Sequence, residues 1–176
     1  MHSRRDGQLP RAIVTRMHPG CSAMTDTTGT LRNRREAVVR EHMESENRHE
    51  FDATIATFAR PRYEIIPTGE IFDGKAAVRG YFAASLAAFP DRRNELRALH
   101  HADDAVIVEF DLLGTHLGPL RGVPPTGKAF RCPMTAFLVF ESNRIICERA
   151  YFDSATILRE ARERTGPKMH RLLRRC

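Results

Sequence analysis

The chain has 176 residues, of which 41% are hydrophobic and 28% are charged, and both values are ordinary for one globular domain with a sizeable core. No segment approaches the run of about 18 apolar residues that a membrane-spanning helix needs, so we do not expect a membrane protein. The net charge of +6 comes from the ends, because residues 1–24 contribute +3, residues 154–176 contribute +5 and residues 25–153 contribute −2. The body therefore lacks the basic surface that is typical of nucleic-acid-binding proteins.

The two ends of the chain are expected to lie outside the folded domain. Residues 1–30 are expected to form a disordered extension, in which Met24 is an alternative start, and residues 162–176 a basic tail. No apolar core follows the first basic residues, so a secretory signal is not expected. The four cysteines contain no CxxC pair, which argues against a zinc site and favours a cytoplasmic protein with reduced thiols.

Hydrophobic residues recur at helical spacing in the first half of the chain, which predicts three helices. The first covers residues 31–46, where His42 shares the periodic face with apolar side chains. The second covers residues 51–58 and ends before Pro61, because a residue that precedes proline is biased away from helical geometry. Asp73 is expected to act as the N-cap of the third helix.

The second half alternates with a period of two, which predicts strands. Polar turn formers separate successive strands, and Asp153 is expected to cap a short final helix, with catalysis as its alternative role. Helices followed by antiparallel strands indicate an α+β fold, in which a curved sheet wraps around the helices and leaves a cavity open at one end. The predicted strands cover residues 63–66, 70–72, 94–101, 105–116, 130–140 and 144–152.

Alternation along each strand assigns its side chains to the two faces of the sheet. Between residues 105 and 116 the even positions are apolar, so we expect them to face the helices, whereas Glu109 and Asp111 face solvent or another subunit. In the next strand, Met134 and Ala136 belong to the inner face. In the last strand the even positions are assigned to that face, namely Ile146, Glu148, Ala150 and Phe152.

Two motifs carry a family resemblance: H-x-G-P-L-R-G-x-P-P-T-G at residues 116–127 and E-R-x-Y-F-D-x-x-x-I-L-R at residues 148–159. With the order of the predicted elements, they make residues 31–161 resemble the SnoaL-like ester/polyketide cyclase group of the nuclear transport factor 2-like superfamily. The resemblance implies a cone of three helices in a curved antiparallel sheet, commonly a homodimer, with a pocket for a small molecule. It also implies cyclase, isomerase, dehydratase or epoxide hydrolase chemistry, mostly without a metal or an organic cofactor.

The chain departs from the polyketide cyclases at the positions that matter most for catalysis. The family's acid/base aspartate corresponds to Ala150, and a pocket histidine corresponds to Ala136. A methyl group cannot exchange a proton, so the cyclase mechanism does not carry over intact. The chain either uses another acid/base group as a cofactor-free cyclase, isomerase or lyase, or it is a non-catalytic ligand-binding or interaction module.

Glu148 is the first candidate for the missing acid/base group. It lies two residues before Ala150 on the same predicted face, and an apolar cavity raises the pKa of a carboxyl group toward the range of a useful general base. The alternatives are that Glu148 pairs with Arg131 or Arg149, or that it faces solvent. His116 is the second catalytic candidate, because it titrates near neutral pH beside the glycine- and proline-rich loop; its alternative role is to hold that loop by a hydrogen bond to a backbone carbonyl.

The remaining candidates are expected to contact a substrate. Tyr63 and Tyr151 would donate hydrogen bonds to a carbonyl oxygen, unless they serve only as packing residues, and His49 would reach the cavity from the start of the second helix. Other expected pocket residues are Met134, Ala136, Ala150 and Phe152. The outer face of the sheet is apolar enough to predict a homodimer through Ile107, Glu109, Phe137 and Val139.

Overall fold

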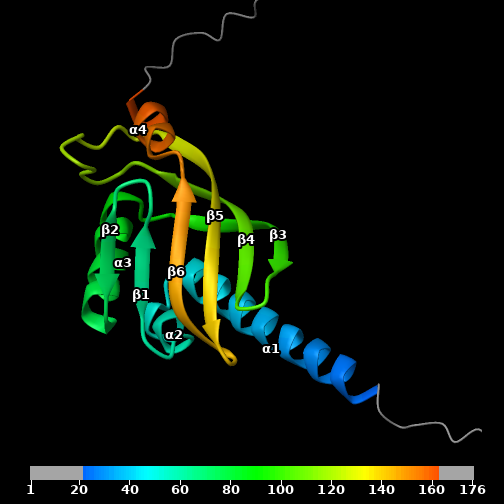
Figure 1. The fold of residues 1–176 in the computed structure, drawn as a ribbon. Helices are drawn as coiled ribbons and strands as arrows, with labels where there is room; N and C mark the ends of the chain where they lie inside the picture. Colours follow the sequence, from blue (N-terminus) through cyan, green and yellow to red (C-terminus); the bar gives the residue numbers. More distant parts are fainter. Residues whose placement is uncertain (1–21, 163–176) are drawn as a thin grey trace, which may run out of the picture.

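A computed structural model describes residues 22–162 of the chain, so the expected extension up to residue 21 and the expected tail from residue 163 lie outside the described residues (Figure 1). In the described part, the first helix begins nine residues before the expected Leu31. The elements are α1 (Ser22–Asn47), α2 (Phe51–Ala56), β1 (Arg62–Ile65), β2 (Glu70–Asp73), α3 (Lys75–Ala88), β3 (Arg93–His101), β4 (Ala105–Thr115), β5 (Ala129–Glu141), β6 (Arg144–Phe152) and α4 (Ser154–Arg162).

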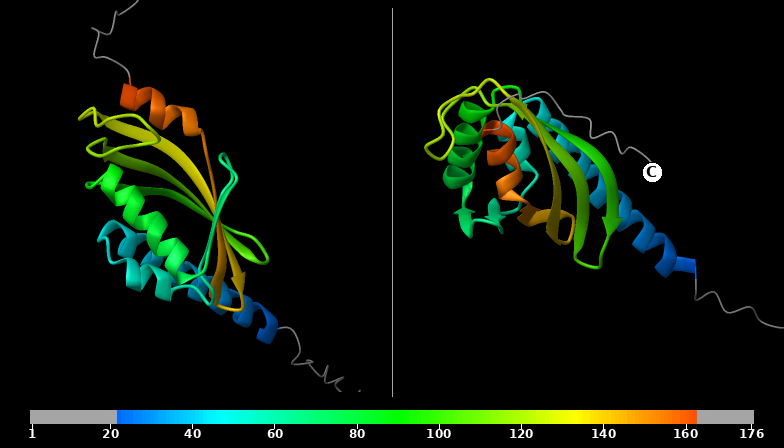
Figure 2. Two further views of the ribbon diagram at one scale, coloured as in Figure 1. Left: turned by 90° about the vertical axis from the view of Figure 1, so that its left-hand side faces the viewer. Right: turned by 90° about the horizontal axis from the view of Figure 1, so that it is seen from above.

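The strands form one six-stranded sheet in the order β2-β1-β6-β5-β4-β3. The sheet bends around α1, α2 and α3, and α4 lies at one end beyond β6 (Figure 2). The α+β class is therefore confirmed. The sheet is not wholly antiparallel as expected, because β1 pairs with β6 in parallel, with Tyr63 opposite Glu148 and Ile65 opposite Ala150. None of the helices in residues 22–162 is long and apolar enough to cross a membrane.

The inner face of the sheet carries the alternating apolar residues expected for β4 and β5. Val106 and Val108 on β4, and Cys132 and Leu138 on β5, have no exposed surface. These side chains pack with those of the helices into one core, and burial of this apolar surface is the main term that favours folding.

The alternation on β6 is interrupted by an irregularity in its pairing with β5, between Val139 and Phe140. An extra residue in a ladder reverses which side chains face inward. Ile145 is therefore fully buried in the core, and the expected inward position of Ile146 is wrong. From Glu148 onward the expected face is correct, because Glu148 and Ala150 are both buried.

The outer face of β4 differs from the expectation at Asp111, which is fully buried rather than solvated. Its Oδ2 accepts hydrogen bonds from Nε of Arg97 at 2.5 Å and Nε of Arg131 at 2.8 Å, so the two arginines cover it. Burial alone would raise the pKa of Asp111, but the two guanidinium groups outweigh it and hold this pKa below its usual value. Glu109 is exposed as expected and contacts Nε2 of His100 at 3.1 Å.

Three expected helix boundaries have different outcomes. The predicted N-cap of α3 is wrong, because Gly74 occupies that position at φ 90° and Asp73 instead binds Arg60 and Arg62. Asp153 does cap α4, since its carboxylate accepts hydrogen bonds from the Ala155 N–H at 3.0 Å and the Thr156 hydroxyl at 2.7 Å. Helix α2 ends at Ala56, before the expected residue 58, because Phe58 pairs with Ile145 in an isolated bridge.

Residues 117–127 form a loop that folds back onto the C-terminus of α3, and we call it the rim loop. The N–H groups of Leu117 and Gly118 both donate to the carbonyl of Ala88, at 3.0 and 3.1 Å, which satisfies an otherwise unpaired end of the helix. The approach is so close that a Cβ on Gly118 would lie 1.9 Å from the carbonyl oxygen of Ala87. Only glycine fits this contact.

We predict that G118A destabilises the protein by about 1–3 kcal/mol, the usual range for inserting a methyl group into a filled site. Urea unfolding monitored by circular dichroism measures this change. G29A is the matched control, because Gly29 lies in α1 and the methyl group of an alanine there would have no neighbouring atom within 4 Å, so stability should be unchanged or slightly raised. Equal stability of G118A and wild type would show that the rim loop is not held against α3 in solution.

Candidate functional site

An apolar cavity of about 520 Å³ opens at the α4 end of the cone. It is enclosed by α3, α4, the rim loop and the ends of β1, β5 and β6 that lie nearest to α4. Its size is within the range of small-molecule sites. Most of its wall is apolar, including Phe72, Phe89, Leu112 and Ile157. Its polar groups are the phenol of Tyr81, a few hydroxyls and one pair of opposite charges at the mouth.

The cavity includes some of the expected substrate-binding residues and excludes others. Met134 and Phe152 line it. Ala136, Ala150 and Tyr63 are buried in the core but do not line the cavity.

Tyr151 and His49 are also outside the cavity wall. Tyr151 points to the outer face of the sheet, where it is 41% exposed and its ring contacts Phe137 at 5.4 Å between centroids. It is therefore on the wrong face to polarise a ligand inside the cone. His49 lies in the turn between α1 and α2 at φ 59°, and its Nε2 contacts the carbonyl oxygen of Arg92 at 3.1 Å. This contact ties the turn to the start of β3.

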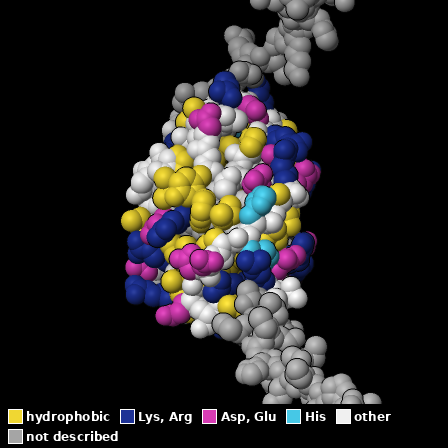
Figure 3. All heavy atoms as spheres, turned by 45° about the vertical axis from the view of Figure 1, so that its right-hand side comes forward, with side chains coloured by type: hydrophobic (Ala, Val, Ile, Leu, Met, Phe, Trp, Pro, Cys, Tyr) yellow, Lys and Arg dark blue, Asp and Glu magenta, His cyan; other side chains and the backbone are white. Residues whose placement is uncertain are grey.

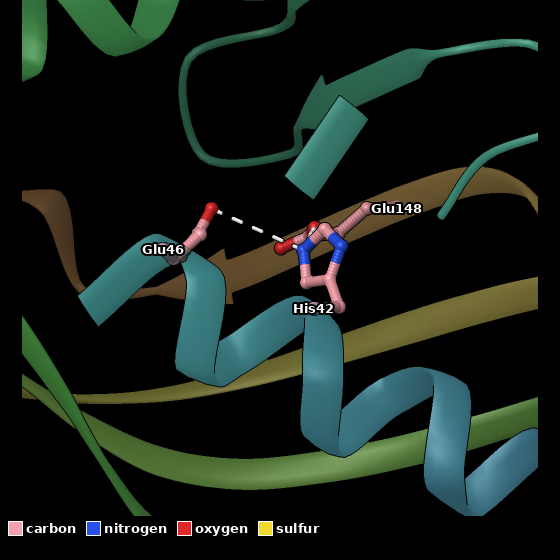
Figure 4. A group of neighbouring side chains, drawn as sticks. All are labelled: His42, Glu46 and Glu148. Atoms are coloured by element: carbon pink, nitrogen blue, oxygen red, sulfur yellow. Dashed lines mark ion pairs between the residues drawn. The ribbon is translucent and has the colours of Figure 1, made fainter. Parts of the chain in front are cut away.

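A buried polar cluster lies deeper in the cone, and we call it the acid–base cluster: His42 and Glu46 on α1, Tyr63 on β1 and Glu148 on β6. Figure 4 shows the three ionisable members, with Glu46 and Glu148 pointing toward the imidazole of His42. His42 Nε2 lies 3.1 Å from Glu148 Oε2 and 3.9 Å from Glu46 Oε1. The side chain of His42 is only 1% exposed and that of Glu148 only 10%.

Glu148 therefore meets the expectation that it is buried inside the cone, but neither expected arginine is its partner. Arg149 binds Glu64 and Arg131 binds Asp111, both on the outer face. Tyr63, rather than Glu148, hydrogen-bonds with Nε2 of His42, at 3.1 Å. Oε2 of Glu148 consequently has no hydrogen-bond donor among the described residues, although the imidazole lies beside it. The nearest polar group to this orphaned oxygen is therefore the imidazole of His42, 3.1 Å away.

Glu46 has a full set of donors and thus a structural role in the cluster. Its Oε1 accepts the Tyr63 hydroxyl at 3.2 Å, and its Oε2 accepts the Asn94 amide at 2.6 Å and lies 3.4 Å from the guanidinium of Arg92. Arg92 is itself buried and also donates to the hydroxyl of Ser85 at 2.8 Å. A buried carboxylate is tolerable only with such partners.

The hydrogen bonds around His42 assign a proton to each ring nitrogen. Thr57 donates its one hydroxyl proton to the carbonyl of Thr54 at 2.7 Å, so toward His42 Nδ1, at 3.0 Å, it is an acceptor. Tyr63 has one hydroxyl proton, and when it donates this proton to Glu46 it is an acceptor toward Nε2 as well. His42 is then an imidazolium that faces the carboxylates of Glu46 and Glu148.

The pKa shifts in the cluster agree with this assignment. Burial alone would lower the pKa of His42, and Arg92 lowers it further, but contact with Glu148 and the charge of Glu46 outweigh both and raise it above the ordinary value. Burial and the same two carboxylates raise the pKa of Tyr63 well above its ordinary value, so its phenol remains protonated. The cluster thus combines one cation, two carboxylates and a neutral phenol, with Arg92 balancing the charge.

Tyr81 connects the cavity with the acid–base cluster. It lines the cavity, and its ring centroid lies 5.6 Å from that of Tyr63. Ile65 on β1 belongs to the cavity wall, and Tyr63 on the same strand belongs to the cluster. The two residues are two positions apart, which is about 7 Å along a strand. The cluster therefore lies one layer of side chains below the cavity. Burial first, and then Glu46 and Glu148, raise the pKa of Tyr81 to about 12 against an opposing effect of Arg92.

The spacing of His42, Glu46 and Glu148 would also suit a divalent cation, because one donor atom from each lies within 4.8 Å of the others. Two observations disfavour this. The Tyr63 hydroxyl already occupies the hydrogen-bonding direction of His42 Nε2, where a metal would bind, and Arg92 supplies positive charge to Glu46. A metal at Nε2 would also have to displace the proton that the contact with Glu148 favours there.

His116 is fully buried but belongs neither to the cavity wall nor to the acid–base cluster. Its Nδ1 lies 3.1 Å from the hydroxyl of Thr126, and its backbone carbonyl accepts the N–H groups of Thr126 and Gly127. The ring therefore holds the base of the rim loop, as in its alternative role, through a hydroxyl rather than the expected carbonyl. This geometry gives no support to a catalytic role.

His42 and Glu46 in the acid–base cluster and Tyr81 in the cavity wall do not appear among the candidates from the sequence. His42 shares an amphipathic face with apolar residues, and a histidine and a glutamate at i and i+4 on a buried helical face are a usable signal for such a cluster. Tyr81 gives no such signal, because it is next to Phe82 in a helix that is apolar on most sides.

We predict that H42Q lowers stability by about 3 kcal/mol near pH 6, because removal of one partner leaves a buried charge uncompensated. The folded-state pKa of His42 is raised, so the stability due to its protonation is complete below the unfolded value of about 6.5 and is lost as pH rises through the folded-state value. The difference between wild type and H42Q should thus shrink as the pH is raised from 6 through that folded-state value. Urea unfolding at several pH values measures it.

The control for H42Q is H100Q, which removes an exposed histidine whose carboxylate partner is also exposed. We expect little change in its stability at any pH. A stability difference for H42Q that stays constant across this pH range would contradict a charged His42.

Comparisons with known proteins identify the fold and the family. A family model for the SnoaL-like domain matches residues 39–148, and a search of curated proteins finds no match. A proposed polyketide cyclase from Xanthomonas campestris pv. campestris is 20% identical with a TM-score of 0.66, covering 74% of this chain and 98% of that chain. IdmH, a proposed polyketide cyclase from Streptomyces antibioticus, is 21% identical with a TM-score of 0.63, covering 72% and 96%.

AclR, a proposed hydroxylase from Streptomyces galilaeus, is equally similar, with 21% identity, a TM-score of 0.62 and coverage of 70% of this chain and 92% of that chain. At such identities these structures share a fold with this chain, and a fold by itself does not choose the reaction. A nuclear transport factor 2-like protein from Burkholderia pseudomallei has the same fold, with 16% identity, a TM-score of 0.63 and coverage of 74% of this chain and 98% of that chain. Because the family model covers most of the cone, from α1 to Glu148 itself, the chain belongs to the SnoaL-like domain family.

Proposed function

We propose that this protein binds a small, largely apolar carbonyl compound in its cone and catalyses a cofactor-free isomerase, cyclase or lyase reaction by proton transfer. The observation that carries the proposal is an apolar cavity that lies directly above the buried acid–base cluster. Tyr81 lines this cavity and also lies close enough to Glu46 and Glu148 for their charges to raise its pKa. An apolar cavity with few convergent polar groups and shifted pKa values is typical of an active site.

The proposed roles follow from the protonation states. Tyr81, a neutral phenol at physiological pH, donates a hydrogen bond to the carbonyl oxygen of the ligand, the role expected from the sequence for Tyr63 and Tyr151. Glu148 accepts the proton from the carbon next to that carbonyl on its orphaned oxygen, and the electron pair of the broken C–H bond moves onto the carbonyl oxygen. In an isomerase reaction the enolate takes this proton back from Glu148 at another carbon. In a cyclase reaction it attacks a second carbonyl of the same molecule, whose oxygen receives the proton from Glu148. In a lyase reaction it expels a leaving group from the β-carbon, which departs with that proton. His42 and Glu46 position Glu148 and Tyr63.

The rival function is a non-catalytic ligand-binding module. One observation favours it: Glu148 does not line the cavity, so the reacting carbon must pass between Ile65 and Tyr81 to reach it, or a water molecule must carry the proton. The two functions differ in whether a bound ketone loses its α-proton.

We predict that the protein accelerates exchange of α-protons for deuterium in bicyclic ketones such as 1-tetralone and 2-tetralone, measured by proton NMR in D₂O. E148Q should slow this exchange by about 10²–10⁴-fold, the usual contribution of a general base. E109Q is the matched control, because Glu109 is an exposed carboxylate on the opposite face of the sheet, and it should not change the rate. Saturable binding of these ketones without exchange would favour the non-catalytic module.

We also propose a homodimer through the outer face of the sheet. Ile107, Phe137 and Val139 are half-buried there, and Tyr151 adds an exposed ring beside Phe137. Figure 3, which brings the β3 side of the molecule forward, shows hydrophobic side chains gathered among charged ones.

The free thiols of Cys132 and Cys147 support the cytoplasm as the compartment of this protein.

Light scattering at micromolar concentration should give twice the mass of the 20.0 kDa chain. F137E should reduce the mass to that of a monomer, because a dimer would bury the added charge. L117E, at an exposed position on the rim loop, should remain dimeric. Melting curves of both variants verify that they fold, and a monomeric wild type would refute the dimer.

A further inference from the structure

The rim loop places an arginine over the mouth of the cavity in an unusual backbone conformation. Leu120 and Val123 are joined by two backbone hydrogen bonds, of 3.0 and 2.7 Å, so Arg121 and Gly122 form a two-residue turn. Both have left-handed backbones, with φ of 44° and 78°. Such turns favour Asn, Asp or Gly at the first position, and a bulky residue held there is typical of functional sites.

The side chain of Arg121 forms part of the cavity wall and reaches across the mouth. Its guanidinium donates to Oε2 of Glu70 at 2.6 Å, and the same oxygen accepts the hydroxyl of Thr68 at 2.6 Å. Thr68 and Glu70 belong to the β1–β2 hairpin, whereas Arg121 belongs to the rim loop, so the contact joins two separate elements that line the cavity.

Arg121 and Glu70 are the only charged residues in the described wall of the cavity. Their side chains are 52% and 49% exposed, and a solvated ion pair of this kind contributes little to stability. A carboxylate on a ligand can therefore replace Glu70 at small cost, and the planar guanidinium binds carboxylates through two parallel hydrogen bonds.

We propose that Arg121 is a specificity-determining residue that binds a carboxylate on the ligand, with Glu70 as its partner when the cavity is empty. The ligand is then an apolar acid whose carboxylate lies at the mouth and whose ring or chain fills the cavity. This inference rests on the proposed function for the ligand's apolar body and its carbonyl group near Tyr81, and it narrows the substrate class to keto acids.

The test uses a fluorescent pair of equal shape, anthracene-2-carboxylate and its methyl ester, titrated with the full-length protein at neutral pH. The chain has no tryptophan, so anthracene fluorescence reports binding without interference. We expect wild type to bind the acid about tenfold more tightly than the ester, and R121Q to bind the two with equal affinity. E70Q should bind the acid more tightly than wild type, because Arg121 has no competing carboxylate.

R149Q is the matched control, since Arg149 is also a half-exposed arginine paired with a glutamate, Glu64, but lies outside the cavity wall. It should bind both probes as wild type does. Equal binding of acid and ester by wild type, or an unchanged preference in R121Q, would overturn the role of Arg121 and leave the proposed function intact. If neither probe binds saturably, the proposed apolar site is itself wrong, and this inference fails with it.

Discussion

The contact between His42 and Glu148 joins the first helix to the last strand inside an apolar cone, and the arrangement of the other buried polar groups depends on it. Removing two charges from water costs several kcal/mol per ion, and the attraction between them compensates only when neighbouring groups complete their hydrogen bonds. Tyr63, Thr57 and Glu46 provide this completion around the imidazole. The cluster therefore fixes how α1 is rotated and how far it is inserted against β1 and β6.

Aromatic rings separate this charged layer from the cavity. Tyr63 packs against Tyr81 and Phe82, and Tyr81 packs against Phe72, with ring centroids 5.0–5.6 Å apart. These rings shield the cluster from bulk solvent while leaving one phenol beside the cavity. In a medium of low dielectric constant, both the attraction within the cluster and the hydrogen bond that Tyr81 offers are stronger than in water.

The two ends of the cavity differ in chemistry because different elements form them. The deep end is bounded by α3 and the parallel pair of β1 and β6, which are held rigidly in the core. The mouth is bounded by the rim loop, the β1–β2 hairpin and α4, whose charged side chains remain solvated. The phenol of Tyr81 is thus held rigidly at the deep end, whereas the ion pair of Arg121 and Glu70 at the mouth is exposed to solvent. Substitutions at one end of the cavity can therefore change its chemistry without changing the other end.

Local patterns in the sequence determined the α+β class, the order of the elements, the cap at Asp153 and the inward direction of Glu148, because periodicity and capping depend on neighbouring residues. Tertiary structure decided the partner of Glu148, the parallel pairing of β1 with β6, the inward position of Ile145 and the replacement of Tyr151 by Tyr81 as the phenol at the cavity. These features result from strand register, an irregularity in the ladder and helix rotation, which are set by contacts between residues far apart in the chain and leave no local pattern.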